Sequence, residues 1–171
     1  KIRFFCQFVA ALIIITKGIY INSISLLDIY NQSYLIYIFI PFTILSIVGF
    51  TNAFNFIDGI DGLASFLFIK SILLLLIIIY NNNPAYDLSF FYLILISILP
   101  FIIFNLGFVK NNKIFLGDSG STLIGFILGW VLIFFSQVEE NLINPILVIW
   151  IAPIVVFDFF ILIFLRIYNK I

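Results

Sequence analysis

Six long apolar runs restrict the fold of this chain more than any other feature of its sequence. Short polar connections such as "NNNPAYDL" and "QVEENLIN" separate them. A membrane-spanning helix needs about 20 apolar residues, because lipid offers no hydrogen-bond partner to backbone polar groups. We therefore predict an all-α, polytopic integral membrane protein with about six transmembrane helices in a single transmembrane domain, residues 1–171. The runs cover approximately residues 4–16, 34–51, 64–80, 89–109, 121–137 and 145–166.

Composition agrees with a membrane protein and limits its chemistry. Hydrophobic residues make up 64% of the 171 residues and charged residues only 9%, whereas soluble domains carry roughly a quarter charged residues. The formal net charge of zero argues against a nucleic-acid partner. There is no histidine and a single cysteine, Cys6, which excludes an internal disulfide and the usual base at neutral pH. Acid–base or metal chemistry must therefore use carboxylates and hard cations.

Two of the apolar runs carry a further expectation. The first run is short for a membrane span, and we expect it to continue through Lys17 to Ile21. The third run contains Lys70, whose long aliphatic side chain can snorkel toward the membrane surface.

The distribution of basic residues predicts the orientation of the chain in the membrane. With six spans, both termini share one side with the second and fourth connections. Loops rich in lysine and arginine face the cytoplasm, so this side is predicted to be cytoplasmic. It holds Lys1, Arg3, Lys110, Lys113, Arg166 and Lys170, whereas the opposite side holds Lys17, Asp28, Asp87, Glu139 and Glu140.

The stretch "NAFNFIDGIDGLA" places Asp58 and Asp61 between two apolar runs. If this turn is helical, their spacing directs both carboxylates to one side. Two neighbouring anions repel each other unless a cation lies between them, and magnesium takes one or two carboxylates together with substrate phosphates. The alternative is a polar turn in which the aspartates cap the following helix.

The stretch "FLGDSGST" carries Asp118 in a turn rich in glycine and serine that opens the fifth run. Free N–H groups at a helix N-terminus bind anions, and Lys110 and Lys113 lie just upstream. The motif therefore suits a phosphate beside a metal-binding carboxylate. The alternative is that Asp118 or Ser119 is simply a helix N-cap.

Two more polar residues lie inside apolar runs. Asp158, within "PIVVFDFFILIFLR", is interpreted as an inward-facing polar contact near the rim of the membrane, because unpaired charges inside a span are costly. Asn105, within "FIIFNLGF", is interpreted in the same way.

Taken together, "NAFNFIDGIDGLA" and "KIFLGDSGSTLIGF" closely resemble motifs of the polyprenyl-phosphate N-acetylhexosamine-1-phosphate transferases, glycosyltransferase family 4. The stretches "KIRFFCQFVAALIII" and "NPILVIWIAPIVVFDFF" extend the resemblance over essentially the whole chain. The second stretch and the alanine in "NAFN" look more like undecaprenyl-phosphate N-acetylglucosamine-1-phosphate transferases than phospho-N-acetylmuramoyl-pentapeptide transferases, which remain the alternative.

The resemblance implies a function at the cytoplasmic face of the bacterial inner membrane. An oxygen of a polyprenyl phosphate attacks the sugar-proximal phosphorus of a UDP-N-acetylhexosamine, releasing UMP and leaving a lipid diphosphate-sugar for cell-envelope polysaccharides such as O-antigen. Mg²⁺, or Mn²⁺ in its place, neutralises the diphosphate. Direct attack and a covalent aspartyl intermediate both fit, as do several sugars and pathways. A homodimer is one possible assembly.

Individual roles also follow from the resemblance. Asp118 corresponds to a magnesium ligand, and Asp58 and Asp61 to catalytic residues of the active site. Phe115 resembles an aromatic residue that stacks on uracil. The remaining matches are Asn55 and Gly117 as substrate-binding residues, and Arg3 or Lys1 as a phosphate-binding residue.

The chain departs from the family pattern at both ends. The family carries an adjacent aspartate pair before the helix that opens this chain, and a histidine-rich loop after the helix that closes it. It also has about ten spans. The chain is therefore expected to cover the middle of the enzyme. A transporter or a structural membrane subunit is the rival interpretation, although the aspartates at helix ends on one face favour an enzyme whose site opens to the membrane surface.

Overall fold

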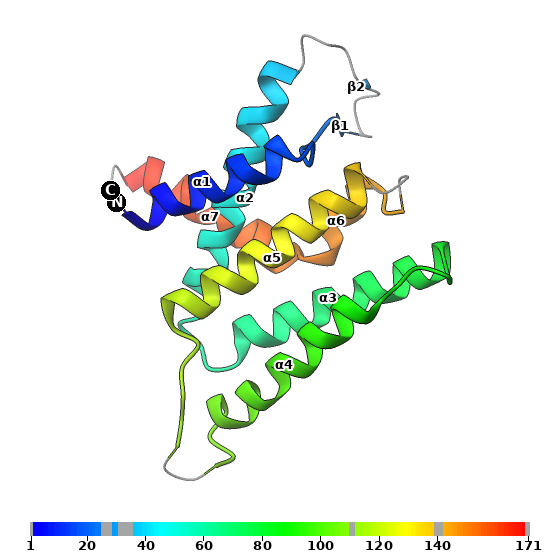
Figure 1. Cartoon of the computed structure of the whole chain (residues 1–171). Coiled ribbons are helices and arrows are strands. Elements are labelled where there is room, and N and C mark those ends of the chain that lie inside the picture. Colours follow the sequence, from blue (N-terminus) through cyan, green and yellow to red (C-terminus); the bar gives the residue numbers. More distant parts are fainter. Residues whose placement is uncertain (1, 25–28, 31–35, 110–111, 139–141, 170–171) are drawn as a thin grey trace.

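The computed structural model describes residues 2–24, 29–30, 36–109, 112–138 and 142–169. Apart from a two-residue antiparallel pair of strands, its regular elements are helices (Figure 1), so the all-α prediction is confirmed. In chain order they are α1 Ile2–Thr16, β1 Ser23–Ile24, β2 Ile29–Tyr30, α2 Ile36–Ile57, α3 Leu63–Asn82, α4 Ser89–Asn105, α5 Gly117–Gln137, α6 Pro145–Ile151 and α7 Pro153–Asn169.

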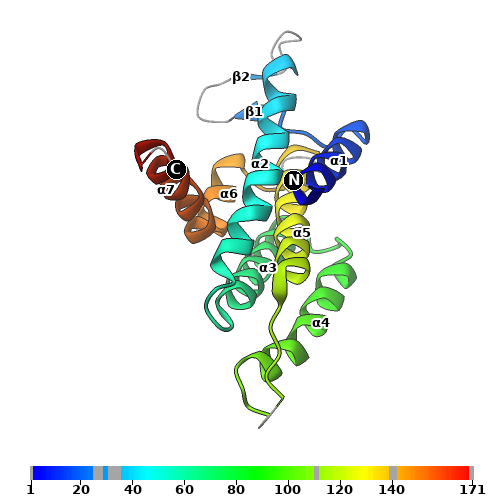
Figure 2. The same ribbon diagram turned by 90° about the vertical axis from the view of Figure 1, so that its left-hand side faces the viewer.

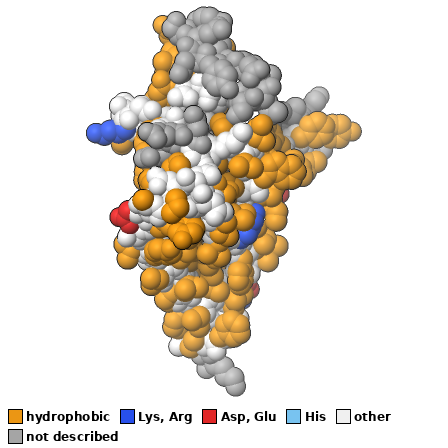
Figure 3. Space-filling view, turned by 90° about the vertical axis from the view of Figure 1, so that its right-hand side faces the viewer, with side chains coloured by type: hydrophobic (Ala, Val, Ile, Leu, Met, Phe, Trp, Pro, Cys, Tyr) orange, Lys and Arg blue, Asp and Glu red, His pale blue; other side chains and the backbone are white. Residues whose placement is uncertain are grey.

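Three of the described helices have the length of membrane spans, and the described helices have apolar surfaces. Among the described residues, α2, α3 and α5 are long and apolar enough to cross a bilayer, and α1 and α4 are shorter apolar helices. Large hydrophobic side chains project outward along these helices. Figure 3 shows hydrophobic side chains over most of the described surface on one face, with few charged groups between them. Such a surface is unfavourable in water and suits lipid, so the prediction of an integral membrane protein is confirmed.

The centre of the bundle is the contact between α2 and α5, the most extensive between any two elements (Figure 2). Gly125 allows this approach, because a Cβ atom there would lie 3.1 Å from the Thr51 Cα atom and 2.8 Å from the Phe54 Cβ atom. Phe54 and Leu128 are fully buried where the two helices meet the core. The close packing brings the C-terminus of α2 to the N-terminus of α5, and therefore the two acidic motifs together.

Two helix ends differ from the sequence prediction. The first apolar run does not continue to Ile21 as one helix. α1 ends at Thr16, and Gly18 adopts a left-handed conformation with φ +79°. This conformation ends the helix, and glycine adopts it without strain because it has no side chain. α2 instead runs past residue 51 to Ile57, and the first glycine or proline after residue 51 is Gly59.

The last apolar run is broken into α6 and α7. Pro153 has no N–H to donate and disfavours the helical conformation at Ala152, whose φ of −128° and ψ of 52° are not helical. The Ile151 carbonyl instead accepts from Lys70 Nζ at 2.7 Å and Ser71 Oγ at 3.1 Å. Lys70 was expected to snorkel; its ammonium group stabilises the C-terminal end of α6 instead.

Candidate active site where two acidic motifs meet

A hydrogen-bonded network joins three helix ends at one end of the bundle. Arg3 Nη1 from α1 donates to Asn55 Oδ1 of α2 at 3.0 Å and lies 3.2 Å from Asp118 Oδ2 of α5. Asn55 Nδ2 donates to Asp118 Oδ1 at 3.0 Å and to Ser121 Oγ at 2.8 Å. Asn55 thus has both amide atoms engaged, and it orients a carboxylate whose side chain is still 79% exposed.

Asp58 lies beside this network in the turn between α2 and α3. The turn is not helical, so the spacing of Asp58 and Asp61 does not align them as a helix would. Burial raises the pKa of Asp58 above its usual value and is the largest effect. A hydrogen bond from the Gly117 backbone opposes this rise, and the charges of Asp118 and Asp61 add to it.

Asp61 joins the same turn to the loop before α5. Its carboxylate forms an ion pair with the Lys113 ammonium group. That ammonium group also lies 5.3 Å from the centroid of the Phe115 ring, within the range of a cation–π contact. Phe115 is 70% exposed, so the ring face opposite Lys113 is available to a planar ligand.

Asn105 holds this loop in place from the end of α4. Its side chain is buried, and Nδ2 donates to the Ile114 carbonyl at 2.8 Å. The prediction that Asn105 makes an inward-facing polar contact is confirmed, and the contact lies next to Phe115.

The helix-cap alternatives do not hold for these aspartates. The N-cap of α3 is Gly62, in the left-handed conformation with φ 75°, and that of α5 is Leu116; neither helix has a side-chain cap. Asp118 lies in the first turn of α5, where the positive end of the helix dipole stabilises an anion. The carboxylates of the two motifs are thus not used to cap the helices that follow them.

The carboxylate oxygens of the site are suitable ligands for a hard cation, but they are few in number. Among the described residues there is no group of three or more His, Cys, Asp and Glu side chains arranged to hold a metal. Asp58 and Asp118 lie close enough for the charge of one to affect the other. Two neighbouring carboxylates match magnesium, which keeps several waters and takes its remaining ligands from phosphate oxygens.

The sequence analysis missed Gln7, Asn52 and Ser121. Asn52 Nδ2 donates to Gln7 Oε1 at 2.8 Å, one helical turn from the Arg3–Asn55 contact. Helical spacing was the available signal, because Gln7 follows Arg3 by four residues and Asn52 precedes Asn55 by three.

Other sequence candidates lie apart from this network. Lys1 and Lys110 fall outside the described residues. Asp158 is half-buried on α7, and no ion pair among the described residues joins it to the site.

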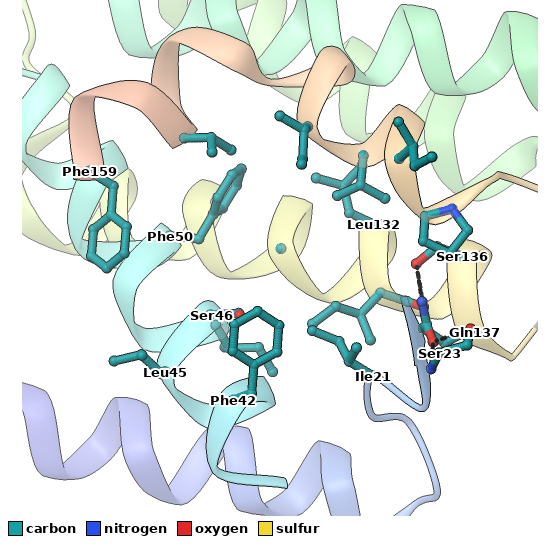
Figure 4. Close-up of a pocket in the computed structure, with 18 of the residues that line it drawn as sticks. Ile21, Ser23, Phe42, Leu45, Ser46, Phe50, Leu132, Ser136, Gln137 and Phe159 are labelled. Atoms are coloured by element: carbon teal, nitrogen blue, oxygen red, sulfur yellow. Dashed lines mark hydrogen bonds between the residues drawn. The ribbon is translucent and has the colours of Figure 1, made fainter. Parts of the chain in front are cut away.

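An apolar pocket of about 300 Å³ occupies a different part of the bundle. Figure 4 shows Phe42 and Phe50 of α2, Leu132 of α5 and Phe159 of α7 around it, with Gln137 at one end. Gln137 Oε1 accepts there from the backbone N–H groups of residues 22 and 23, at 2.9 and 3.0 Å. No acidic or basic side chain is among its described lining residues, so the charged chemistry belongs to the network at the other end of α5.

The fold and the site define a polytopic helical membrane protein with an acidic site at the meeting of helix ends. Residues 1–136 match the family model described as Glycosyl transferase family 4. The chain belongs to that family.

Curated relatives agree with the family assignment. Undecaprenyl-phosphate alpha-N-acetylglucosaminyl 1-phosphate transferase of Yersinia pestis is 36% identical over 117 residues, 68% of this chain and 32% of the relative. The protein of the same name in Escherichia coli (strain K12) is 35% identical over the same shares. A probable undecaprenyl-phosphate N-acetylglucosaminyl 1-phosphate transferase of Bacillus subtilis (strain 168) is 29% identical over 170 residues, 99% of this chain and 47% of the relative. The chain thus spans between about a third and about half of these relatives. No solved structure matches it at a significant level.

Proposed function

We propose that this chain carries part of the active site of a transferase that moves N-acetylglucosamine 1-phosphate from a UDP-sugar to a polyprenyl phosphate. The observation that carries the proposal is the network of Arg3, Asn55 and Asp118, in which helix ends from three segments of the chain converge. The names of the relatives support the lipid carrier and the sugar, and the membrane fold suits a substrate that enters from the bilayer.

The reaction balances as a phosphoryl transfer. An oxygen of the lipid phosphate bonds to the sugar-proximal phosphorus, and the bond from that phosphorus to the bridging oxygen of the diphosphate breaks. UMP leaves with the bridging oxygen. Charge accumulates on both phosphates, so a guanidinium group and free N–H groups at the N-terminus of α5 stabilise the site. Arg3 and the first turn of α5 supply these groups.

Asp58 is assigned to proton transfer within this proposal. Its pKa is raised by burial, which makes the carboxylate a better acceptor for the proton of a monoprotonated lipid phosphate. The Gly117 N–H that bonds to it fixes the direction of the carboxylate. Phe115 offers its exposed ring face to the uracil, and Lys113 holds it near Asp61.

Mg²⁺ fits the proposal as the cofactor, with Mn²⁺ as a substitute. Asp118 is the main candidate ligand, because its carboxylate is exposed while Asn55 fixes its orientation. A bound divalent cation would neutralise the diphosphate and the leaving UMP.

The site is proposed to face the cytoplasm of the bacterial inner membrane. The basic side of the chain carries both acidic motifs, and basic loops stay on the cytoplasmic side. Single cysteines at Asn82 and Asn112, in a background with Cys6→Ser, test this with an impermeant thiol reagent on intact cells. Position 82 should be labelled and position 112 protected; the reverse pattern contradicts the orientation.

Transfer of labelled sugar tests the function itself. Because the chain spans only part of its relatives, residues 1–171 should replace the matching segment of the Bacillus subtilis relative. Membranes containing this chimera are incubated with UDP-GlcNAc labelled in the sugar, undecaprenyl phosphate and Mg²⁺. We expect label in the organic extract and equimolar UMP in the aqueous phase.

Two controls make this result specific. Asp118→Asn keeps the size of the side chain and should abolish transfer, whereas Asp87→Asn, at the opposite end of the bundle, should leave it unchanged. UDP-N-acetylmuramoyl-pentapeptide as donor tests the alternative substrate. Lipid labelling that is equal in the parent and the Asp118→Asn chimera would contradict the proposal.

A further inference from the structure

A second hydrogen bond between α1 and α2 lies one helical turn below the candidate site. Gln7 is on the same face of α1 as Arg3, and Asn52 is on the same face of α2 as Asn55. Asn52 Nδ2 donates to Gln7 Oε1 at 2.8 Å, and the same nitrogen donates to the Val48 carbonyl at 2.7 Å. The two helices are thus joined by two successive polar contacts, of which the upper one belongs to the site.

The lower contact is costly for a purely structural pair. Gln7 is 8% exposed and Asn52 6%, and their remaining amide atoms, Gln7 Nε2 and Asn52 Oδ1, have no hydrogen-bond partner among the described residues. A buried polar atom without a partner destabilises a fold, and two apolar side chains of similar size would avoid that loss. Buried polar pairs of this kind are known to define the register of packed helices.

The rest of α1 makes mainly apolar contacts. Among its described residues, only Gln7 and Ala11 are buried, and Ile14 packs against the same apolar cluster as Ala11. Ala11 offers a small apolar contact that tolerates sliding, whereas an amide–amide hydrogen bond is formed at one alignment only. Arg3 lies one turn away on the same helix, so a small shift of α1 would move its guanidinium group from Asn55 and Asp118.

We propose that Gln7 is a positioning residue for the transfer reaction: through Asn52, it sets the register of α1 so that Arg3 reaches Asn55 and Asp118. This inference rests on the proposed function. It assigns no contact with substrate to Gln7 and places its effect entirely on Arg3.

A double-mutant cycle in the chimera tests the route of this effect. Gln7→Leu should lower kcat by roughly ten- to hundredfold, the loss expected from a misplaced catalytic group, while the protein stays folded because Asn52 Nδ2 keeps its hydrogen bond to the Val48 carbonyl. Arg3→Gln removes the group that Gln7 positions. The double variant should be no slower than Arg3→Gln alone, because the second substitution then has nothing left to misplace. Losses that multiply would overturn the proposal.

A swapped pair provides the rescue. Gln7→Asn shortens one partner and should slow the reaction, whereas Gln7→Asn combined with Asn52→Gln restores the summed length of the two side chains. The combined variant should recover most of the lost activity. Failure to recover, in a protein that remains folded, would also count against register control.

Cross-linking separates this inference from the proposed function. Arg3→Cys and Asn55→Cys, with Cys6→Ser, are joined by a short bifunctional thiol reagent in the membrane. Gln7→Leu should lower the cross-linking yield severalfold if it shifts α1. If the parent chimera transfers no sugar, the proposed function fails and the cross-linking yield still decides the register; an unchanged yield would overturn the inference by itself.

Discussion

The substitution Gly125→Ala tests the contact that brings the two acidic motifs together. Gly125 is buried where α5 crosses α2. A methyl group there would meet the Phe54 Cβ atom at 2.8 Å and the Thr51 Cα atom at 3.1 Å. Neither atom belongs to the flexible end of a side chain, so the helices must move apart to accept the methyl group.

Gly129→Ala is the matched control one turn along the same helix. Its methyl group would lie 3.4 Å from the nearest atom, Cδ1 of the Phe50 ring, which is ordinary van der Waals contact, and Gly129 lines the apolar pocket. Both substitutions replace a glycine inside a helix and gain the same roughly 0.5–1 kcal/mol of helix propensity. Their difference therefore isolates the steric effect.

Overpacking a well-packed contact costs about 1–3 kcal/mol. We expect Gly125→Ala to be less stable than Gly129→Ala by that amount, which is roughly a tenfold change in the unfolding equilibrium for each 1.4 kcal/mol. Activity should fall with it, because α5 carries Asp118 away from Asn55 as the helices separate.

Unfolding by SDS in mixed micelles provides the measurement. Trp130 of α5 packs against Phe90 and Phe134, with ring centroids 6.1 and 6.2 Å away, so its fluorescence reports the packing of this helix. Gly125→Ala should unfold at lower SDS than the parent and Gly129→Ala at the same or higher SDS. If the two variants unfold together, the close approach of α2 and α5 is not the constraint inferred here.

Three further predictions concern the site. Asp118→Asn in the chimera should reduce transfer by orders of magnitude while the SDS midpoint stays the same; normal turnover at limiting Mg²⁺ would refute its assignment as a ligand. Burial raises the pKa of Asp58 above 3.8, so the folded state binds the proton more tightly and the free energy of unfolding should fall as pH rises from 3.8 through the raised value. Asp58→Asn should abolish this fall and be more stable than the parent at pH 7 although inactive, as followed by unfolding across pH. Asn105→Leu removes one hydrogen bond to the loop that carries Phe115, which is worth about 1 kcal/mol. The KM for UDP-GlcNAc should rise about fivefold and kcat should change little. An unchanged KM would contradict the role of the loop.

The sequence by itself determined the class of the protein and the position of its polar groups along the chain. Apolar runs of spanning length allow only helices in lipid, and the rarity of charge makes each carboxylate conspicuous. Two predicted spans separate "NFIDGIDG" from "FLGDSGST", and an even number of spans returns the chain to the same side of the membrane. The sequence therefore placed both motifs on one side before any contact was known. Asn105 was interpreted as an inward polar contact for the same reason, since a polar group in an apolar run needs a partner.

Only the tertiary structure decided which groups touch. Periodicity cannot show that Gly125 lets α5 approach α2, because the approach depends on the absence of a side chain at one crossing point. The break at Pro153 is visible in sequence, but the donation from Lys70 to the Ile151 carbonyl comes from another helix. In the sequence, Gln7 and Asn52 look like two unrelated polar residues within apolar segments. They become a pair only because α1 and α2 run antiparallel, and side chains distant along the chain meet only after the helices have packed.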